Sequence, residues 1–104
     1  MSIINGKTII ERYPGMIPVI VDKASTSNLP EIQKKKFICP ADISFSAFSY
    51  IIRKRIFLKP EKALFLFVNN KLPNMNDTMF EIYKQYKDNN NILHVVYQEE
   101  ATFG

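Results

Sequence analysis

The segment KFICPADISFSAFSYIIRKRI, residues 36–56, carries the strongest structural signals in the chain. Lys36–Cys39 has the composition of a short strand, and Pro40, which has no N–H to donate, is typical of a strand end or a sheet edge. Residues 42–44 then offer a helix N-cap. Beyond the cap, apolar residues recur at spacings of three and four, as in an amphipathic helix: Phe45, Phe48, Ile52 and Ile56. We therefore predict the main helix here, ending before Pro60.

Apolar runs on both sides of this segment predict the remaining elements. Ile17–Val21 is rich in β-formers and predicts a first strand. The run 63–68 is short and aromatic, which predicts a central strand buried on both faces. Thr78 and Glu81 fit the capping box of a short helix, and 92–97 predicts a last strand. The result is an α+β fold, a four-stranded mixed sheet crossed by one main helix, which resembles the β-grasp of ubiquitin.

Composition limits the classes of protein that fit. The chain has 104 residues, of which 46% are hydrophobic and 23% charged, as expected for one globular domain. A net charge of +4 is a mild bias toward acidic partners or anionic surfaces. A lone cysteine and the absence of a secretory leader predict a reduced, cytoplasmic setting. The longest apolar run is far shorter than the ~20 residues of a membrane-spanning helix.

Many separate segments, in order from Arg12 to Gly104, resemble the autophagy-related protein 8 family. They are Arg12–Pro14, Ile17–Val21, Lys34–Phe37, Ile52–Ile56, Ala63–Phe65, Phe67–Asn70 and Phe103–Gly104. The resemblance implies a ubiquitin-like modifier that is not an enzyme and needs no cofactor or metal. It implies a ubiquitin-like domain over 13–98 and a flexible tail over 99–104. Residues 1–12 replace the family's longer helical extension with a short segment.

The resemblance assigns Gly104 as the conjugation site. It implies that an activating and a conjugating enzyme pass this glycine to phosphatidylethanolamine, and that a delipidating cysteine protease releases it. A glycine has no Cβ to hinder attack on its carboxylate. Two acyl chains, at ~0.8 kcal/mol per buried CH₂, anchor a protein stably. We therefore expect a cytoplasmic monomer that becomes peripheral on autophagosomal or other organelle membranes once it is lipidated.

The resemblance also implies docking of cargo receptors through peptides with an aromatic residue and, three positions later, an aliphatic one. It places an aromatic-binding pocket at Pro18, Ile20, Lys36, Ile38 and Ile92. It places an aliphatic-binding pocket at Phe37, Cys39, Pro40, Ile43, Phe48, Ile51 and Arg55. Side-chain alternation agrees with this division, because Lys36 and Ile38 share one face of a strand while Phe37 and Cys39 share the other. A strand edge between two pockets suits β-augmentation by the peptide.

The N-terminal segment departs from the family pattern. Two helices usually precede the position of Tyr13, but here we expect at most one short turn within Thr8–Arg12. The aromatic pocket is therefore expected to be wider and more exposed. Four isoleucines are available to cover part of the same surface: Ile3, Ile4, Ile9 and Ile10.

Other readings of these features remain open. Without the resemblance, the stripe around Phe48 would be taken as core alone, and the clusters 34–36 and 53–55 as solvated charge. Cys39 with His94 could be imagined as a thiol catalytic pair, although a small buried thiol is the better reading. The chain could instead be a modifier attached to another protein, or a non-covalent basic adaptor module. No nucleic acid is expected as a partner.

Overall fold

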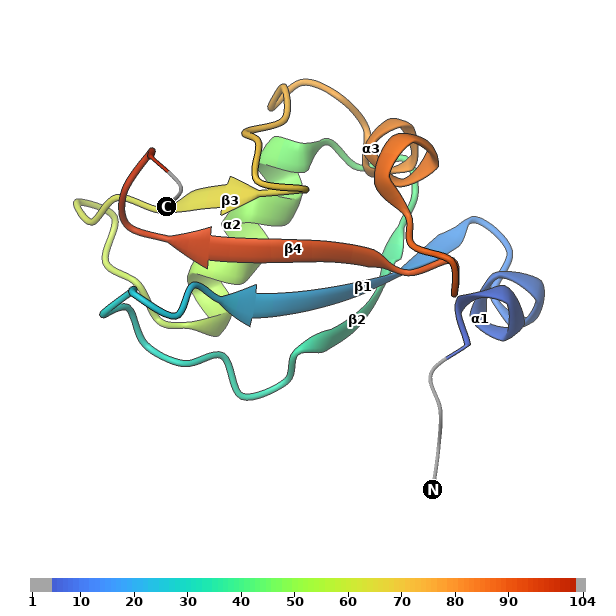
Figure 1. Ribbon diagram of the computed structural model, residues 1–104, viewed down its shortest axis with the longest axis horizontal. Helices are drawn as coiled ribbons and strands as arrows, with labels where there is room; N and C mark the ends of the chain where they lie inside the picture. The colour runs from blue at the N-terminus through green and yellow to red at the C-terminus, as the bar shows by residue number, and fades with distance from the viewer. Residues whose placement is uncertain (1–4, 103–104) are drawn as a thin grey trace.

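The computed structural model describes residues 5–102 and shows one mixed sheet with a helix across one face (Figure 1). The elements that it contains are α1 (Gly6–Arg12), β1 (Met16–Lys23), β2 (Lys36–Pro40), α2 (Phe45–Arg55), β3 (Phe65–Phe67), α3 (Met79–Tyr86) and β4 (Leu93–Gln98). The strand order is β2-β1-β4-β3. β1 is antiparallel to β2 and parallel to β4, and β3 is antiparallel to β4. The predicted α+β class and mixed sheet are confirmed.

The position of the aromatic run 63–68 corrects one prediction. It forms the three-residue edge strand β3, whereas β1 and β4 are the central strands. Leu66 and Phe67, which point to opposite faces, are both buried although the strand lies at an edge. Burial on both faces was therefore predicted correctly, but it does not require a strand on each side.

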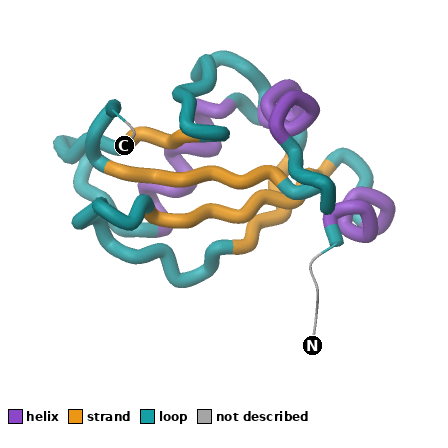
Figure 2. Tube along the Cα trace, viewed as in Figure 1, coloured by secondary structure: helices purple, strands orange, loops and turns teal. Residues whose placement is uncertain are grey.

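The main helix α2 begins and packs as its sequence predicts. The Ser44 side chain accepts a hydrogen bond from the Ala47 N–H at 3.0 Å and caps the helix. The apolar stripe faces the core, with each side chain at most 2% exposed: Phe45, Phe48, Ile52 and Ile56. Figure 2 shows α2 behind the sheet, so the opposite sheet face is open to the viewer. The capping box of α3 is also present, with Thr78 and Glu81 bonded reciprocally.

The N-terminal helix is longer than predicted. It starts at Gly6 and spans seven residues, with Asn5 as the cap that accepts from the Lys7 N–H. The Gly6 N–H donates to the Asn90 carbonyl at 2.8 Å, and a Cβ on Gly6 would lie 2.2 Å from the Asn91 carbonyl oxygen. The close contact between α1 and the turn before β4 therefore requires a glycine. Figure 1 shows α1 at the end of the sheet where β4 starts.

Long-range hydrogen bonds hold the connection between β1 and β2. The buried hydroxyl of Tyr97 donates to the Pro30 carbonyl at 2.6 Å and accepts from the Ile32 N–H at 2.9 Å. Burial raises the pKa of Tyr97, so the phenol remains protonated over the physiological range. This irregular connection is thus fixed to β4. Among residues 5–102, no helix combines the length and apolar character needed to cross a bilayer.

Candidate functional site

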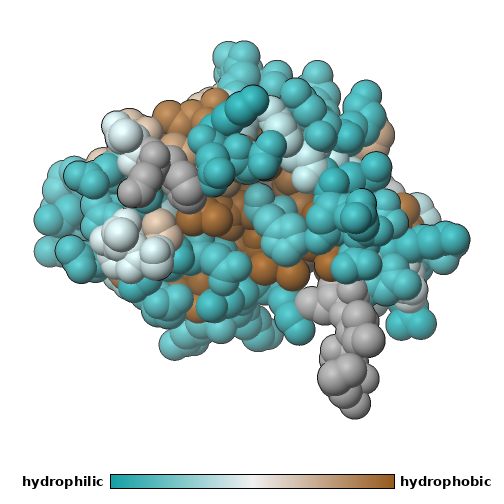
Figure 3. Space-filling model, in the orientation of Figure 1, coloured by the Kyte–Doolittle hydropathy of each residue, from teal (hydrophilic) through white to brown (hydrophobic). Residues whose placement is uncertain are grey.

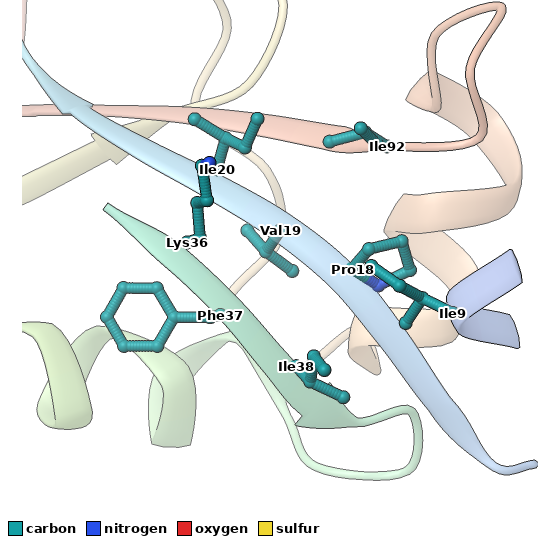
Figure 4. A pocket seen from close by; sticks show the side chains of 8 residues that line it. All are labelled: Ile9, Pro18, Val19, Ile20, Lys36, Phe37, Ile38 and Ile92. Carbon is teal, nitrogen blue, oxygen red and sulfur yellow. The ribbon is translucent and has the colours of Figure 1, made fainter. Parts of the chain in front are cut away.

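A cavity of about 240 Å³ opens on the sheet face that α2 leaves uncovered, beside α1 (Figure 4). It is lined by Ile9, Pro18, Val19, Ile20, Lys36, Phe37, Ile38 and Ile92. The structure thus brings together all five residues that the resemblance assigned to an aromatic-binding pocket. The surface view agrees, because apolar side chains gather along the middle of this face (Figure 3).

Strand pairing places the walls of this cavity. Pro18 lies opposite Ile38, and Ile20 opposite Lys36, in the antiparallel register of β1 and β2. Because side chains alternate along a strand, both pairs point to the same open face. The buried Ile92 closes the side toward β4, and Ile38, 43% exposed, forms part of the rim. The walls of the cavity are apolar and its one charged lining residue is Lys36. The cavity therefore suits a ligand that carries a planar apolar group next to an acidic group.

The N-terminal helix α1 supplies one wall of the cavity, which the sequence analysis predicted only as partial cover of this surface. Ile9 reaches the cavity from α1, as Figure 4 shows, and Ile10 packs against the core. Both were expected to cover this surface, and the structure places Ile9 there directly. Ile3 and Ile4, which were expected to do the same, lie outside the described residues. The described helix α1 therefore contributes Ile9 to one wall of the pocket, and the expectation that this pocket is wider than is usual in the family stays a prediction.

The residues assigned to an aliphatic-binding pocket lie between β2 and α2, but at two depths. Phe48 and Cys39 are buried in the core. The others reach the surface: Phe37, Pro40, Ile43, Ile51 and Arg55. The Phe37 ring meets Phe48 edge to face at 5.9 Å between centroids, and the Arg55 guanidinium lies 5.2 Å from the Phe37 centroid. Phe37 and Arg55 thus form an aromatic and cationic surface above a filled core.

The thiol and the imidazole of the chain do not form a catalytic pair. Cys39 pairs with Ile17 and is buried on the α2 side of the sheet, and burial raises the pKa of its thiol to about 12. His94 pairs with Ile20 on the opposite face, where its Nε2 lies 2.7 Å from an oxygen of Asp88. The two side chains therefore point away from each other, and the thiol remains protonated at neutral pH.

The tail is hydrogen-bonded over the part that the structure describes. The Glu99 carboxylate accepts from the Ser27 hydroxyl at 2.7 Å and from the Asn28 N–H at 3.0 Å, and the bond from Ser27 lowers its pKa. The Gln98 side-chain amide donates to the carbonyls of Glu100 and Thr102. These hydrogen bonds were not predicted from the sequence, because a polar residue at a strand end forms no recognisable sequence motif. Gly104, the expected conjugation site, lies outside the described residues.

The acidic and metal-binding side chains do not gather into a metal site in the described part of the chain. Between residues 5 and 102, no group of three or more His, Cys, Asp or Glu side chains is close enough to hold a metal ion.

The fold and this site define a ubiquitin-like domain with an apolar cavity on the open face of its sheet. A family model described as "Autophagy protein Atg8 ubiquitin like" matches residues 2–104. The chain therefore belongs to the Atg8 family, as its sequence motifs predict.

Individual relatives agree with this assignment. The chain is 49% identical over 96 residues to Autophagy-related protein 8 of Saccharomyces cerevisiae strain YJM789, a match that covers 92% of this chain and 82% of the relative. It is 48% identical to Autophagy-related protein 8d of Arabidopsis thaliana, with 92% and 80% covered.

Two solved structures share the fold. Trypanosoma brucei ATG8 superposes with a TM-score of 0.86 at 35% identity, covering 95% of this chain and 85% of that one. Plasmodium falciparum Atg8, solved in complex with a Plasmodium falciparum Atg3 peptide, has a TM-score of 0.85 at 34% identity, covering 94% and 87%. The ubiquitin-like architecture is thus common to relatives from distant organisms.

Proposed function

We propose that the chain is a ubiquitin-like autophagy modifier rather than an enzyme. Its Gly104 is joined to phosphatidylethanolamine, and the lipidated form supports autophagosome formation and recruits cargo receptors. The cytoplasmic protein thereby becomes peripheral on an organelle membrane. The observation that carries the proposal is the apolar cavity beside β2, because it supplies a binding site for a partner next to an open strand edge.

The geometry around β2 supports docking of an extended peptide. β2 is an edge strand whose one described partner is β1, so its second edge can pair with a peptide backbone. The cavity lies mainly on the face of β2 that carries Lys36 and Ile38, whereas the Phe37 ring lies on the other face beside Arg55. A bound strand alternates its side chains in the same way, so its aromatic and aliphatic anchors would enter these two surfaces. We propose aromatic-x-x-aliphatic motifs as the ligands.

The proposed partners follow from the conjugation reaction. A relative from Plasmodium falciparum was solved with an Atg3 peptide, which supports a conjugating enzyme among the partners of this chain. An activating enzyme and a delipidating cysteine protease complete the proposed cycle. No partner in this set is a nucleic acid, and the modifier acts as a monomer.

The conjugation proposal is tested by reconstitution. The chain, the activating and conjugating enzymes, ATP and phosphatidylethanolamine vesicles should yield an adduct whose mass exceeds that of the chain by one lipid. Gly104→Ala should abolish this adduct, because a Cβ hinders entry of the terminal carboxylate into the activating site. Gly15→Ala, which meets no atom within 4 Å, is the matched glycine control and should conjugate normally.

Three outcomes would contradict lipid conjugation. They are no adduct with the native chain, an adduct that persists in Gly104→Ala, and a mass increase of protein size. The last outcome would instead indicate a modifier that is attached to another protein. Binding to partners without any adduct would indicate a basic adaptor module.

The docking proposal is tested by titrating the chain with an aromatic-x-x-aliphatic peptide that has acidic flanks. Ile20→Ala should weaken binding by about 1–2 kcal/mol, because it removes part of a wall that the aromatic anchor contacts. Leu72→Ala, at an exposed position outside the cavity, should bind as the native chain does. Equal affinity of the Ile20 variant and the native chain, measured by calorimetry, would exclude this cavity as the aromatic site.

A further inference from the structure

Phe57, the residue after the C-cap of α2, is 89% exposed and has a φ of 56°. Its N–H donates to the Lys54 carbonyl, and the Leu58 N–H donates to the Arg53 carbonyl, at 3.1 and 3.0 Å. These two bonds form a Schellman motif, in which a glycine normally occupies the left-handed position. Here a phenylalanine occupies it instead.

Folding does not account for a phenylalanine at this position. The left-handed conformation is unfavourable for any residue with a Cβ. The ring buries almost no surface in return, because nearly all of it is exposed to solvent. A glycine would therefore cap α2 better, and the exposed ring is available for a contact outside the domain.

The surroundings of Phe57 are mainly cationic. Two hollows flank the ring, one lined by Lys34 and Lys54 and the other by Lys59 and Lys62. None of these four lysines forms an ion pair with a described carboxylate. Glu99 and Glu61 are described carboxylates that lie near this surface in space or in sequence. Glu99 is bonded to Ser27 and Asn28, and Glu61 stands in the same loop as the lysines.

The tail reaches the same end of the molecule. Glu99 lines one of the hollows beside Phe57. Figure 1 shows the end of β4, the loop after α2 and the β1–β2 connection together at this end, away from α1 and α3. Gly104 is five residues beyond Glu99, a span of at most roughly 17 Å. A lipid attached to Gly104 would therefore hold a bilayer within reach of Phe57.

We propose that Phe57 and the four lysines Lys34, Lys54, Lys59 and Lys62, hereafter the Phe57 surface, contact an anionic phospholipid bilayer. The ring enters the interfacial layer and the ammonium groups lie against lipid phosphates and carboxylates. The 89% exposed ring projects from a cationic surface, and this combination suits the interfacial layer of an anionic bilayer. The proposal rests on the proposed function, because the conjugated lipid supplies the bilayer.

A tryptophan reporter tests the proposal without any conjugating enzyme. The chain contains no tryptophan, so Phe57→Trp introduces a single one. Gly104→Cys couples the chain to a maleimide lipid, and Cys39 is spared because it is buried and its pKa is raised to about 12. Because the tether is chemical, failure of enzymatic lipidation leaves this result interpretable.

With phosphatidylserine-containing vesicles, the Phe57→Trp emission should shift to the blue and be quenched by brominated lipids. Phe80→Trp is the matched control, since Phe80 is also exposed and has the Lys84 ammonium 5.2 Å from its ring, but it lies on α3. No shift in Phe57→Trp, or an equal shift in both variants, would overturn the proposal. So would a shift produced by polyglutamate but by no vesicle, which would indicate an acidic peptide ligand.

Phe57→Gly separates membrane contact from folding. This variant should melt a few degrees higher than the native chain, because glycine relieves the left-handed cap. Measured without the lipid tether, its co-sedimentation with phosphatidylserine vesicles should nevertheless be at least about fivefold lower than that of the native chain, because the variant lacks the apolar anchor. A more stable variant that sediments as well as the native chain would contradict the proposal.

Discussion

Replacing Gly6 by alanine is expected to detach α1 and to open the cavity beside β2. The new Cβ would lie 2.2 and 2.5 Å from the carbonyl oxygens of Asn91 and Asn90. Both atoms belong to the backbone of a turn, so they cannot move aside cheaply. The Gly6 N–H bond to Asn90 would also be broken. A seven-residue helix has no stability of its own and should unwind once it leaves this turn.

The loss should appear in both stability and binding. Undocking exposes Ile10, which packs against the core, and withdraws Ile9 from the cavity wall. We expect the free energy of unfolding to fall by about 2–4 kcal/mol. Affinity for an aromatic-x-x-aliphatic peptide should fall at least about tenfold, since one side of the aromatic site is removed. Urea titration and calorimetry measure the two effects.

Gly15→Ala is the matched control for this prediction. Gly15 has a φ of 79°, so alanine is strained there, but an added Cβ meets nothing within 4 Å. This variant should lose about 1 kcal/mol of stability and keep its peptide affinity. If both glycine variants lose peptide affinity equally, the effect is a general consequence of lower stability. The cavity would then not depend on α1.

The sequence predicted those parts of the fold that local chemistry determines. The apolar stripe of α2 and the capping pair Thr78 and Glu81 are patterns within a few residues of each other, and both are confirmed. The edge position of β3 was missed because strand order depends on partners far away in the chain. Hydrophobicity alone predicts that Leu66 and Phe67 are buried, but not which segments cover them.

The parts of the site that escaped prediction depend on tertiary contact. Nothing local distinguishes Gly6 from any other glycine near a helix start, because the turn that it touches is more than 80 residues away. The bonds of Gln98 and Glu99 likewise depend on where the tail and the loop near Ser27 meet. Strand alternation, by contrast, was sufficient to group residues 18 and 20 on one strand and 36 and 38 on the other, and the family resemblance brought the two groups to one pocket.

Phe48→Ala is expected to cause the largest loss of stability among these variants. Phe48 is fully buried, contacts Phe37 edge to face and stacks on Phe45 with ring centroids 6.5 Å apart. Truncation to alanine removes these contacts and leaves a cavity in the core, so the free energy of unfolding should fall by about 3–5 kcal/mol. The urea midpoint should fall with an unchanged slope, which indicates a loss of stability rather than a different denatured state.

Two further variants distinguish the ways in which Phe48 can contribute to peptide binding. If its role is to support the Phe37 ring from below, Phe48→Leu should keep the core filled and bind peptide nearly as the native chain does. Phe37→Ala should lose less stability than Phe48→Ala, because Phe37 is partly exposed, yet it should lose more affinity than Phe48→Leu. A folded Phe48→Leu protein that binds as weakly as Phe37→Ala would show instead that the peptide reaches Phe48 itself. The aliphatic anchor would then have to enter the core between β2 and α2, which requires the two elements to separate on binding.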